Sequence, residues 1–177
     1  GGEEKRAFTL VLKGMIAISK LRWPKGLAGR DMDALARVAL WEQGLDYGHG
    51  TGHGVGSYLS VHEGPQRLAR TGTVPFMPGM ILSNEPGFYK EGAFGIRIEN
   101  LIIVEEAPAL PDQTVPEMFR FETLTYVPID TRLVDVELLT DAERAWLNAY
   151  HAQVLERIGP LVEGKVSTWL TQACAPI

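Results

Sequence analysis

Hydrophobic residues recur at helical spacing in the first part of the chain. Across residues 3–23 an apolar residue returns every three or four positions, and Pro24 ends the pattern. A second helical pattern covers residues 29–44, where Asp31 or Asp33 could cap the first turn. The sequence therefore predicts two helices at the start of the chain, with no strand before them.

The middle of the chain changes from helical spacing to short runs of β-branched and aromatic residues. Residues 47–56 hold too many glycines for a stable helix, so an extended or looped backbone is expected there. Strands are expected over Met80–Ser83, Ile96–Val104 and Phe121–Val127, separated by proline and glycine. These short runs predict a mostly antiparallel sheet.

Helical signals return near the end of the chain. Thr140 followed by Glu143 three positions later forms the pattern of a capping box, and a helix is expected from there to about Ile158. Gly159-Pro160 then opens another helix that ends near Cys174. Helices at both ends and antiparallel strands between them indicate an α+β fold.

Composition and charge narrow the classes of protein that fit. The 177 residues are 45% hydrophobic and 22% charged, as in a globular domain, and the net charge of −5 argues against nucleic acid as a partner. No apolar run reaches the ~18 residues that a membrane helix needs, so no membrane partner is expected. A single cysteine, Cys174, favours a reducing compartment, and we expect a cytoplasmic protein. The chain lacks an initiator methionine, so it can be a fragment or a processed product.

A glycine-rich segment carries three histidines, at positions 49, 53 and 62. In an extended strand an even separation points side chains to one face, so His49 and His53 could look into one cleft. Glycines beside both would leave the backbone open to a substrate or an ion. Histidines in such loops are more often ordinary loop residues than ligands. The His-Glu-x-x-His pattern of helical zinc proteases is absent from the sequence.

Two glutamates follow on neighbouring predicted strands. Glu99 stands in a strand otherwise rich in isoleucine, leucine and valine, with Arg97 two residues before it, and Glu85 ends the preceding strand. A solvated strand face is the simple explanation of such charges. If the two strands pair as a hairpin, however, both carboxylates converge with a histidine. Such a donor set suits Mn²⁺, Co²⁺ or Zn²⁺ better than a closed structural zinc site.

Three motifs in order resemble a known family. They are His-Gly-x-Gly-His-Gly-Val-Gly from His49, Asn-Glu-Pro-Gly-Phe-Tyr from Asn84 and Gly-Ile-Arg-Ile-Glu-Asn from Gly95. Together they resemble the pita-bread metallopeptidases and, among these, aminopeptidase P. The tail, over residues 121–129 and 139–151, resembles the C-terminal extension of the long, cytosolic form. The resemblance covers essentially the whole chain.

The resemblance implies a pita-bread (creatinase/aminopeptidase) fold, with a curved antiparallel sheet and flanking helices. The fold is expected to be incomplete, because the first strands of the family are missing. Residues 1–177 would form the C-terminal part of the catalytic domain, with 119–177 as a C-terminal extension. Two aspartate ligands of the family lie on the missing strands, and no aspartate precedes Asp31 in this chain.

The metal-ligand set follows from the same resemblance. His53 and Glu85 would bind one metal ion, and Glu99 would bridge two. The intact enzyme would hold two divalent ions, with Mn²⁺ expected first and Zn²⁺ or Co²⁺ as alternatives. The isolated fragment would hold one ion or none, because two acidic ligands are absent.

Catalytic roles are implied for four side chains. His49 and His62 would line the substrate cleft, and one of them would contact the scissile peptide or move a proton. Arg97 would neutralise and orient the ligand carboxylates. Glu85 would also assist as a general acid or base.

The resemblance implies that the intact enzyme hydrolyses an N-terminal Xaa-Pro peptide bond with the help of metal ions. It also implies a homodimer, because aminopeptidases of this long form tend to dimerise. The substrate would be a peptide with proline at the second position, and this chain would be an incomplete, inactive fragment. Two alternatives stay open. One is a prolidase acting on Xaa-Pro dipeptides, and the other is a non-catalytic pita-bread binding module, a class that typically loses the ligand residues.

Overall fold

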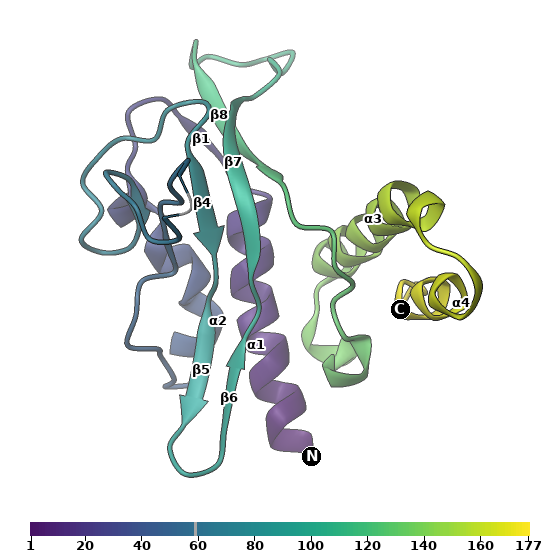
Figure 1. Ribbon diagram of the computed structural model, residues 1–177. Helices are drawn as coiled ribbons and strands as arrows, with labels where there is room; N and C mark the ends of the chain where they lie inside the picture. Colours follow the sequence, from purple (N-terminus) through teal and green to yellow (C-terminus); the bar gives the residue numbers. More distant parts are fainter. Residues whose placement is uncertain (59) are drawn as a thin grey trace.

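The computed structural model describes residues 1–58 and 60–177 and has an α+β architecture (Figure 1). The α-helices are α1 (Gly2–Ser19), α2 (Val38–Trp41), α3 (Asp141–Ile158) and α4 (Gly164–Ala173). The strands are β1 (Arg22–Pro24), β2 (Gly52–His53), β3 (Arg67–Leu68), β4 (Ile81–Asn84), β5 (Gly87–Lys90), β6 (Phe94–Arg97), β7 (Asn100–Glu106) and β8 (Met118–Thr123). Short 3-10 turns cover Gly29–Asp31, Asp33–Ala36, Thr131–Leu133, Val136–Leu138 and Gly159–Leu161.

The main sheet is antiparallel and has the strand order β1-β8-β7-β4. Two shorter antiparallel pairs, β2 with β3 and β5 with β6, complete the strands of the described residues. In Figure 1, β5 continues the line of β4, and β6 leads into β7, so the two pairs form one long ribbon. Helix α1 runs along this ribbon, and its buried face supports the sheet.

Helix α1 confirms the first predicted helix but ends at Ser19, four residues before Trp23. The predicted helix over 20–23 is wrong, because Arg22–Pro24 instead pairs with β8. Trp23 is buried and its ring lies 4.4 Å from that of Phe121, an aromatic contact that a continued helix could not reach. Tertiary packing therefore overrides the helical spacing at this end.

The second predicted helix is wrong as a single element. The structure has two 3-10 turns and the four-residue helix α2 in its place. The backbone here packs directly on α1, since a Cβ placed on Gly14 would lie 2.1 Å from the carbonyl oxygen of Ala36. Buried contacts with α1 and with the following loop fix this segment, and helix propensity is too weak to oppose them.

Strands form in all three predicted regions, but their first and last residues differ from those predicted. The single strand expected over 96–104 is two strands, β6 and β7, because Ile98 and Glu99 interrupt the ladder. The strand expected over 121–127 starts at Met118 and ends at Thr123. Within the glycine-rich segment 47–56, Gly52–His53 is the part that forms a strand.

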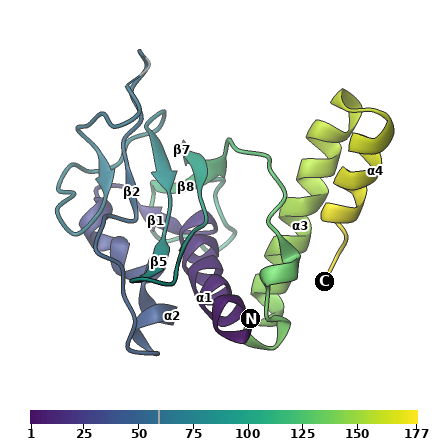
Figure 2. The same cartoon turned by 60° about the horizontal axis from the view of Figure 1, so that its bottom comes forward.

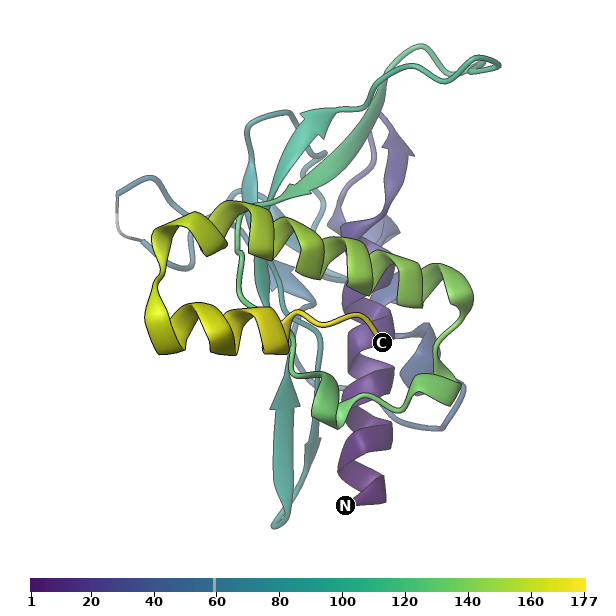
Figure 3. The same cartoon turned by 90° about the vertical axis from the view of Figure 1, so that its right-hand side faces the viewer.

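The C-terminal helices α3 and α4 lie side by side, and α3 is the one next to α1 (Figures 2 and 3). Helix α3 begins with the expected capping box between Thr140 and Glu143. Lys13 of α1 pairs with Glu143 at 2.6 Å, which ties α3 to α1. The last helix starts at Gly164, since Gly159-Pro160 forms a 3-10 turn. Among the helices of the described residues, none combines the length and the apolar character needed to cross a membrane.

Candidate metal centre

Glu85 and Glu99 face each other across the long ribbon. Asn84 pairs with Asn100 at the end of the main sheet, and Gly87 pairs with Arg97 at the start of the β5-β6 pair. The same register continues through the interruption, which places Glu85 opposite Glu99. Directly opposed residues of an antiparallel pair point to one face. The strand break therefore presents two carboxylates together. Glu99 was expected within a strand, but it lies in the break between β6 and β7.

Two buried asparagines hold the ribbon beside these glutamates. Asn84 donates to the carbonyl oxygen of Met15 at 2.9 Å and to the hydroxyl of Ser19 at 3.0 Å, near the end of α1. On the facing strand, the hydroxyl of Tyr150 in α3 lies 3.5 Å from Oδ1 of Asn100. Each strand is thus attached to a different helix at the residue next to its glutamate.

The glycines around His53 allow β2 to pack against β4. A Cβ on Gly52 would lie 1.9 Å from the carbonyl oxygen of Ser83, and one on Gly54 would lie 2.1 Å from that of Glu63. The expectation that these glycines leave the backbone open to a substrate is therefore wrong at both positions. Their role is a close approach of two backbones, which delivers His53 to the glutamates.

The ligand atoms of His53, Glu85 and Glu99 all lie within 4.8 Å of one another. Donor atoms that share one ion at ~2.0–2.3 Å lie roughly 3–4 Å apart, so this spacing suits a common ion. Glu85 is buried, His53 is half-buried and Glu99 is exposed, which leaves one side of the group accessible.

The hydrogen bonding of His53 also fits a metal ligand. Its Nδ1 lies 2.9 Å from the carbonyl oxygen of Gly54, and because a carbonyl only accepts, Nδ1 carries the proton. In the neutral ring Nε2 is then an unprotonated donor atom, and it lies 3.2 Å from Oε1 of Glu85. Two electron-rich atoms that face each other in this way are stabilised by a cation between them. The three residues therefore fit a divalent ion.

Arg97 lies against the carboxylate of Glu85. Its Nη1 is 3.4 Å from Oε2 of Glu85, and its Nε donates to the hydroxyl of Tyr89 at 3.0 Å. The bond with Tyr89 raises the pKa of the guanidinium, partial burial opposes this, and the charges of Glu85 and Glu99 raise it further. Arg97 is thus a fixed positive charge beside the ligand carboxylates.

His49 is connected to Arg97 through the hydroxyl of Tyr89, but it is not part of the ligand group. Its Nε2 lies 2.8 Å from the hydroxyl of Tyr89, and its ring centre lies 4.9 Å from that of Tyr47. His49 borders a hollow with Arg70, whereas His53 borders a neighbouring one. The two hollows adjoin, since both are lined by Gly50, Ala69 and Thr71. The strand expected to carry both histidines covers only Gly52–His53, so His49 lies outside it.

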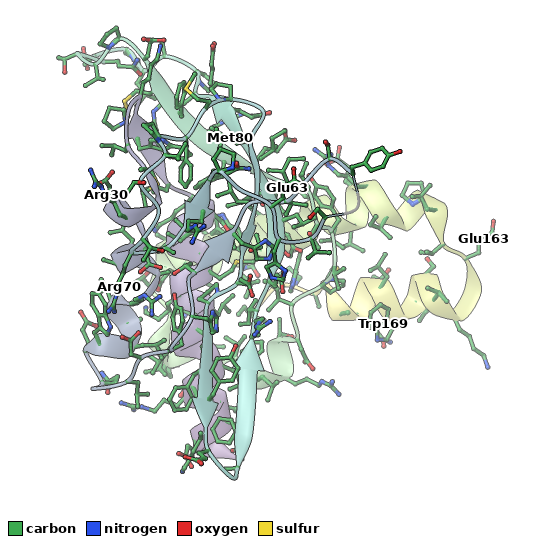
Figure 4. The ribbon with its side chains drawn as sticks, turned by 60° about the vertical axis from the view of Figure 1, so that its left-hand side comes forward. Arg30, Glu63, Arg70, Met80, Glu163 and Trp169 are labelled. Carbon is green, nitrogen blue, oxygen red and sulfur yellow. The ribbon has the colours of Figure 1, made fainter. Side chains whose placement is uncertain are left out.

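His62 lies beside His53, with 3.9 Å between the ring centres. Both histidines line one hollow together with Glu63, Gln66 and Arg67. Figure 4 labels Glu63 on the loop that carries His62, near the middle of the view. The structure thus places His62 next to a candidate ligand while leaving it outside the ligand group itself.

Two models of known protein families match the chain. Residues 1–106 match the model of metallopeptidase family M24, and residues 117–177 match the C-terminal region of peptidase M24. The chain belongs to metallopeptidase family M24.

Members of this family align over nearly the whole chain. A probable Xaa-Pro aminopeptidase P of Tuber melanosporum is 49% identical over 98% of this chain and 29% of its own length. The solved X-prolyl aminopeptidase of Caenorhabditis elegans, described as a cytosolic enzyme with a di-nuclear active site, superposes with a TM-score of 0.90 and 44% identity. The superposition covers 99% of this chain and 29% of the Caenorhabditis elegans chain.

An Xaa-Pro dipeptidase of Bacillus anthracis is a more distant structural relative. It matches with a TM-score of 0.56 and 34% identity, over 71% of this chain and 32% of that one. The α+β pita-bread prediction is confirmed by these structures. The chain spans only 25–30% of the length of the curated M24 relatives that it matches, so it carries part of the fold.

Several residues that support the candidate site cannot be identified from the sequence. Ser83 accepts a hydrogen bond from the backbone of His53 at 3.0 Å and donates to Glu85 at 2.9 Å. Tyr89 joins His49 to Arg97, as described above. A buried pair, Asp33 with Arg37, holds the segment before His53. None of these residues belongs to a recognisable sequence motif. Each supports the site by a contact with another residue, and these contacts form only in the folded chain.

The buried pair has a specific set of contacts. Arg37 contacts both carboxylate oxygens of Asp33 at 2.8 and 3.1 Å, and Arg37 also donates to the carbonyl oxygen of His49 at 2.7 Å. Asp33 accepts from the hydroxyl of Thr51 at 2.7 Å, and the carbonyl of Thr51 accepts from the backbone of Glu85 at 2.7 Å. One ion pair therefore positions the histidine segment and a glutamate together.

Proposed function

We propose that this chain supplies the C-terminal half of the metal site of an Xaa-Pro aminopeptidase. The observation that carries the proposal is the convergence of His53, Glu85 and Glu99, whose donor atoms lie within 4.8 Å of one another. The two glutamates would supply the negative charge of the ligand set, and the imidazole of His53 would complete it. Glu99 would be the bridging carboxylate. The family membership and the named activity of the relatives support this assignment.

Two divalent ions complete the proposed site, and Mn²⁺ is our first choice, with Zn²⁺ or Co²⁺ as alternatives. Carboxylate-rich sites with one imidazole suit these ions. When bound, such ions supply a Lewis acid for a peptide carbonyl and lower the pKa of a water molecule. Two further acidic ligands would come from the part of the protein that precedes this chain, so the isolated chain should bind one ion weakly or none.

The remaining site residues act on the substrate and on the ligands. We assign to Arg97 the neutralisation and orientation of Glu85, which it touches. Because His62 lies beside His53 and is exposed to the hollow, we assign it a contact with the scissile peptide. His49, fixed by Tyr89, would border the proline end of the substrate. Glu85 would also serve as a general acid or base during bond cleavage.

The C-terminal region favours an aminopeptidase over a prolidase. The aminopeptidase of Caenorhabditis elegans aligns over 99% of this chain, whereas the dipeptidase of Bacillus anthracis aligns over 71%. We therefore propose that residues 119–177 form the C-terminal extension of the catalytic domain. This extension would carry a homodimer contact, and the intact enzyme would work in the cytoplasm, as does the relative described as cytosolic.

Hydrolysis assays on the full-length protein test the proposal. With Mn²⁺ present, it should release the first residue from peptides of three or more residues with proline second, and it should cleave Xaa-Pro dipeptides more slowly. Exclusive cleavage of dipeptides would identify a prolidase. Tight binding of peptides without any hydrolysis, at full metal loading, would identify a binding module.

A further inference from the structure

The side chain of Ser83 takes part in the backbone contacts between β2 and β4. On one side of it, the N–H of Glu85 donates to the carbonyl oxygen of Thr51 at 2.7 Å, and on the other side the N–H of Val55 donates to a carbonyl oxygen of β4 at 3.0 Å. His53 and Ser83 stand opposite each other between these two bonds. There the N–H of His53 donates to the hydroxyl of Ser83 at 3.0 Å. A side-chain oxygen thus takes the place that a backbone carbonyl holds on each side.

The direction of both hydrogen bonds of this hydroxyl is fixed. A backbone N–H only donates, so the oxygen of Ser83 accepts from His53 and its proton is donated elsewhere. The acceptor is Oε1 of Glu85, at 2.9 Å. Ser83 is fully buried, so bulk water does not compete for either bond. One side chain therefore joins the backbone of one candidate ligand to the carboxylate of another.

The two oxygens of the Glu85 carboxylate have different partners. Ser83 donates to Oε1, and Nη1 of Arg97 lies 3.4 Å from Oε2. The torsion that turns a glutamate carboxylate has broad energy wells, so this group rotates easily when nothing holds it. Donors at both of its oxygens, from β4 and β6, restrict that rotation. Glu85 is thus presented to His53 in one orientation.

Close packing explains why the short side chain of a serine can make both bonds. A Cβ on Gly52 would lie 3.3 Å from Oγ of Ser83 and 1.9 Å from its carbonyl oxygen, so the two backbones approach without a side chain between them. At this separation a hydroxyl on the Cβ of residue 83 reaches the N–H of His53 directly. The glycine and the serine therefore act together at this point of the site.

We propose that Ser83 is a positioning residue of the metal centre, whose hydroxyl sets the orientation of Glu85 relative to His53 and so raises the affinity for a divalent ion. The inference rests on the proposed function. Ser83 acts through Glu85 and has no part in the reaction itself. Removal of a group that holds a metal ligand in place typically weakens metal binding by about 10- to 100-fold.

Calorimetric titration of the metal-free, full-length protein with Mn²⁺ tests the proposal without substrate. Ser83→Ala removes both hydrogen bonds and should raise the Kd for Mn²⁺ by about 10- to 100-fold. Hydrolysis of an Xaa-Pro peptide by this variant should be reduced at limiting Mn²⁺ and largely restored by excess Mn²⁺, because Ser83 acts through a ligand. If Ser83→Ala does not fold, Ser83→Cys takes its place, since a thiol has a similar size but is a weak donor. The same rise in Kd is expected.

Thr9→Val is the matched control. Thr9 is also fully buried, and its hydroxyl makes the same kinds of bond. It accepts from the backbone N–H of Asp135 at 2.8 Å and donates to the carbonyl oxygen of Lys5 at 2.8 Å, with no candidate ligand among its partners. This variant should lower the midpoint of unfolding but leave the Kd for Mn²⁺ unchanged.

Three results overturn the inference. The first is a Kd for the Ser83 variant equal to that of the original protein. The second is an equal rise in Kd in Thr9→Val, which would make the effect one of general stability. The third is a loss of hydrolysis that excess Mn²⁺ does not reduce, which would place Ser83 in the reaction itself. An unmodified full-length protein that binds no Mn²⁺ would instead overturn the proposed function.

Discussion

Glu85 and Glu99 stand opposite each other at the one interruption of a ribbon whose register is otherwise continuous from Ile81–Ile103 to Lys90–Phe94. A ladder on each side holds the two backbones, so the spacing of the carboxylates is set by strand geometry. The interruption frees both backbones from the ladder and directs the side chains to His53.

This arrangement predicts the effect of Glu99→Gln in the intact protein. Hydrolysis of Xaa-Pro peptides should be abolished, because a neutral amide provides less charge to a shared ligand position than a carboxylate does. Metal content, measured by elemental analysis of the purified variant, should fall together with the rate. A variant that keeps both metal ions and its activity would remove Glu99 from the site.

His62→Ala should separate chemistry from metal binding. His62 lies beside His53 but outside the ligand group, so its loss should leave metal content intact. Both kcat and kcat/KM should fall by about 10²- to 10⁴-fold, the usual contribution of a general acid or base. Steady-state kinetics and metal analysis on one preparation provide the check. Loss of metal without a direct effect on kcat would show that His62 is a ligand.

Arg37→Met tests the buried pair that positions the histidine segment. Asp33 is fully buried, and removal of Arg37 leaves only the exposed Arg70, at 3.8 Å, as a cationic partner, so the unfolding free energy should fall by about 3–5 kcal/mol. Urea unfolding followed by tryptophan fluorescence measures the loss. The double variant Asp33→Leu/Arg37→Met should recover part of that stability, since no isolated charge remains. A single variant within about 1 kcal/mol of the original protein contradicts the prediction.

Asp46 predicts a pH dependence at acid pH. Burial tends to raise its pKa, but hydrogen bonds from Arg37 and its neighbours outweigh this and lower it to about 2 from 3.8. A carboxyl whose pKa falls on folding stabilises the protein above its unfolded value and loses this contribution as the pH falls through about 2. Asp46→Asn should therefore be less stable at pH 6, and the difference from the original protein should shrink between pH 4 and pH 2.

Unfolding of both proteins across that pH range checks the sign. The difference in midpoint should be largest at neutral pH. A difference that grows as the pH falls would indicate that Asp46 is protonated in the folded protein, contrary to its contacts with Arg37 and Arg70.

Sequence alone determined the parts of this protein that depend on local patterns. The spacing of apolar residues fixed α1, and the Thr140–Glu143 capping box fixed the start of α3, because both depend on residues within one or two turns. Three motifs in order indicated the family and the candidate ligands His53, Glu85 and Glu99. The motif glycines Gly52 and Gly54 leave no room for a side chain, and the histidine and the two glutamates converge on one point.

Tertiary structure decided what depends on contacts between distant segments. The helix expected over 29–44 breaks into short turns, because Gly14 admits the backbone of Ala36 and Arg37 holds Asp33 and the carbonyl of His49. The position of Glu99 in a strand break follows from pairing on both sides of it, which no local pattern records. Long-range packing energies exceed local propensities of a few tenths of a kcal/mol per residue, so these features appear only in the folded chain.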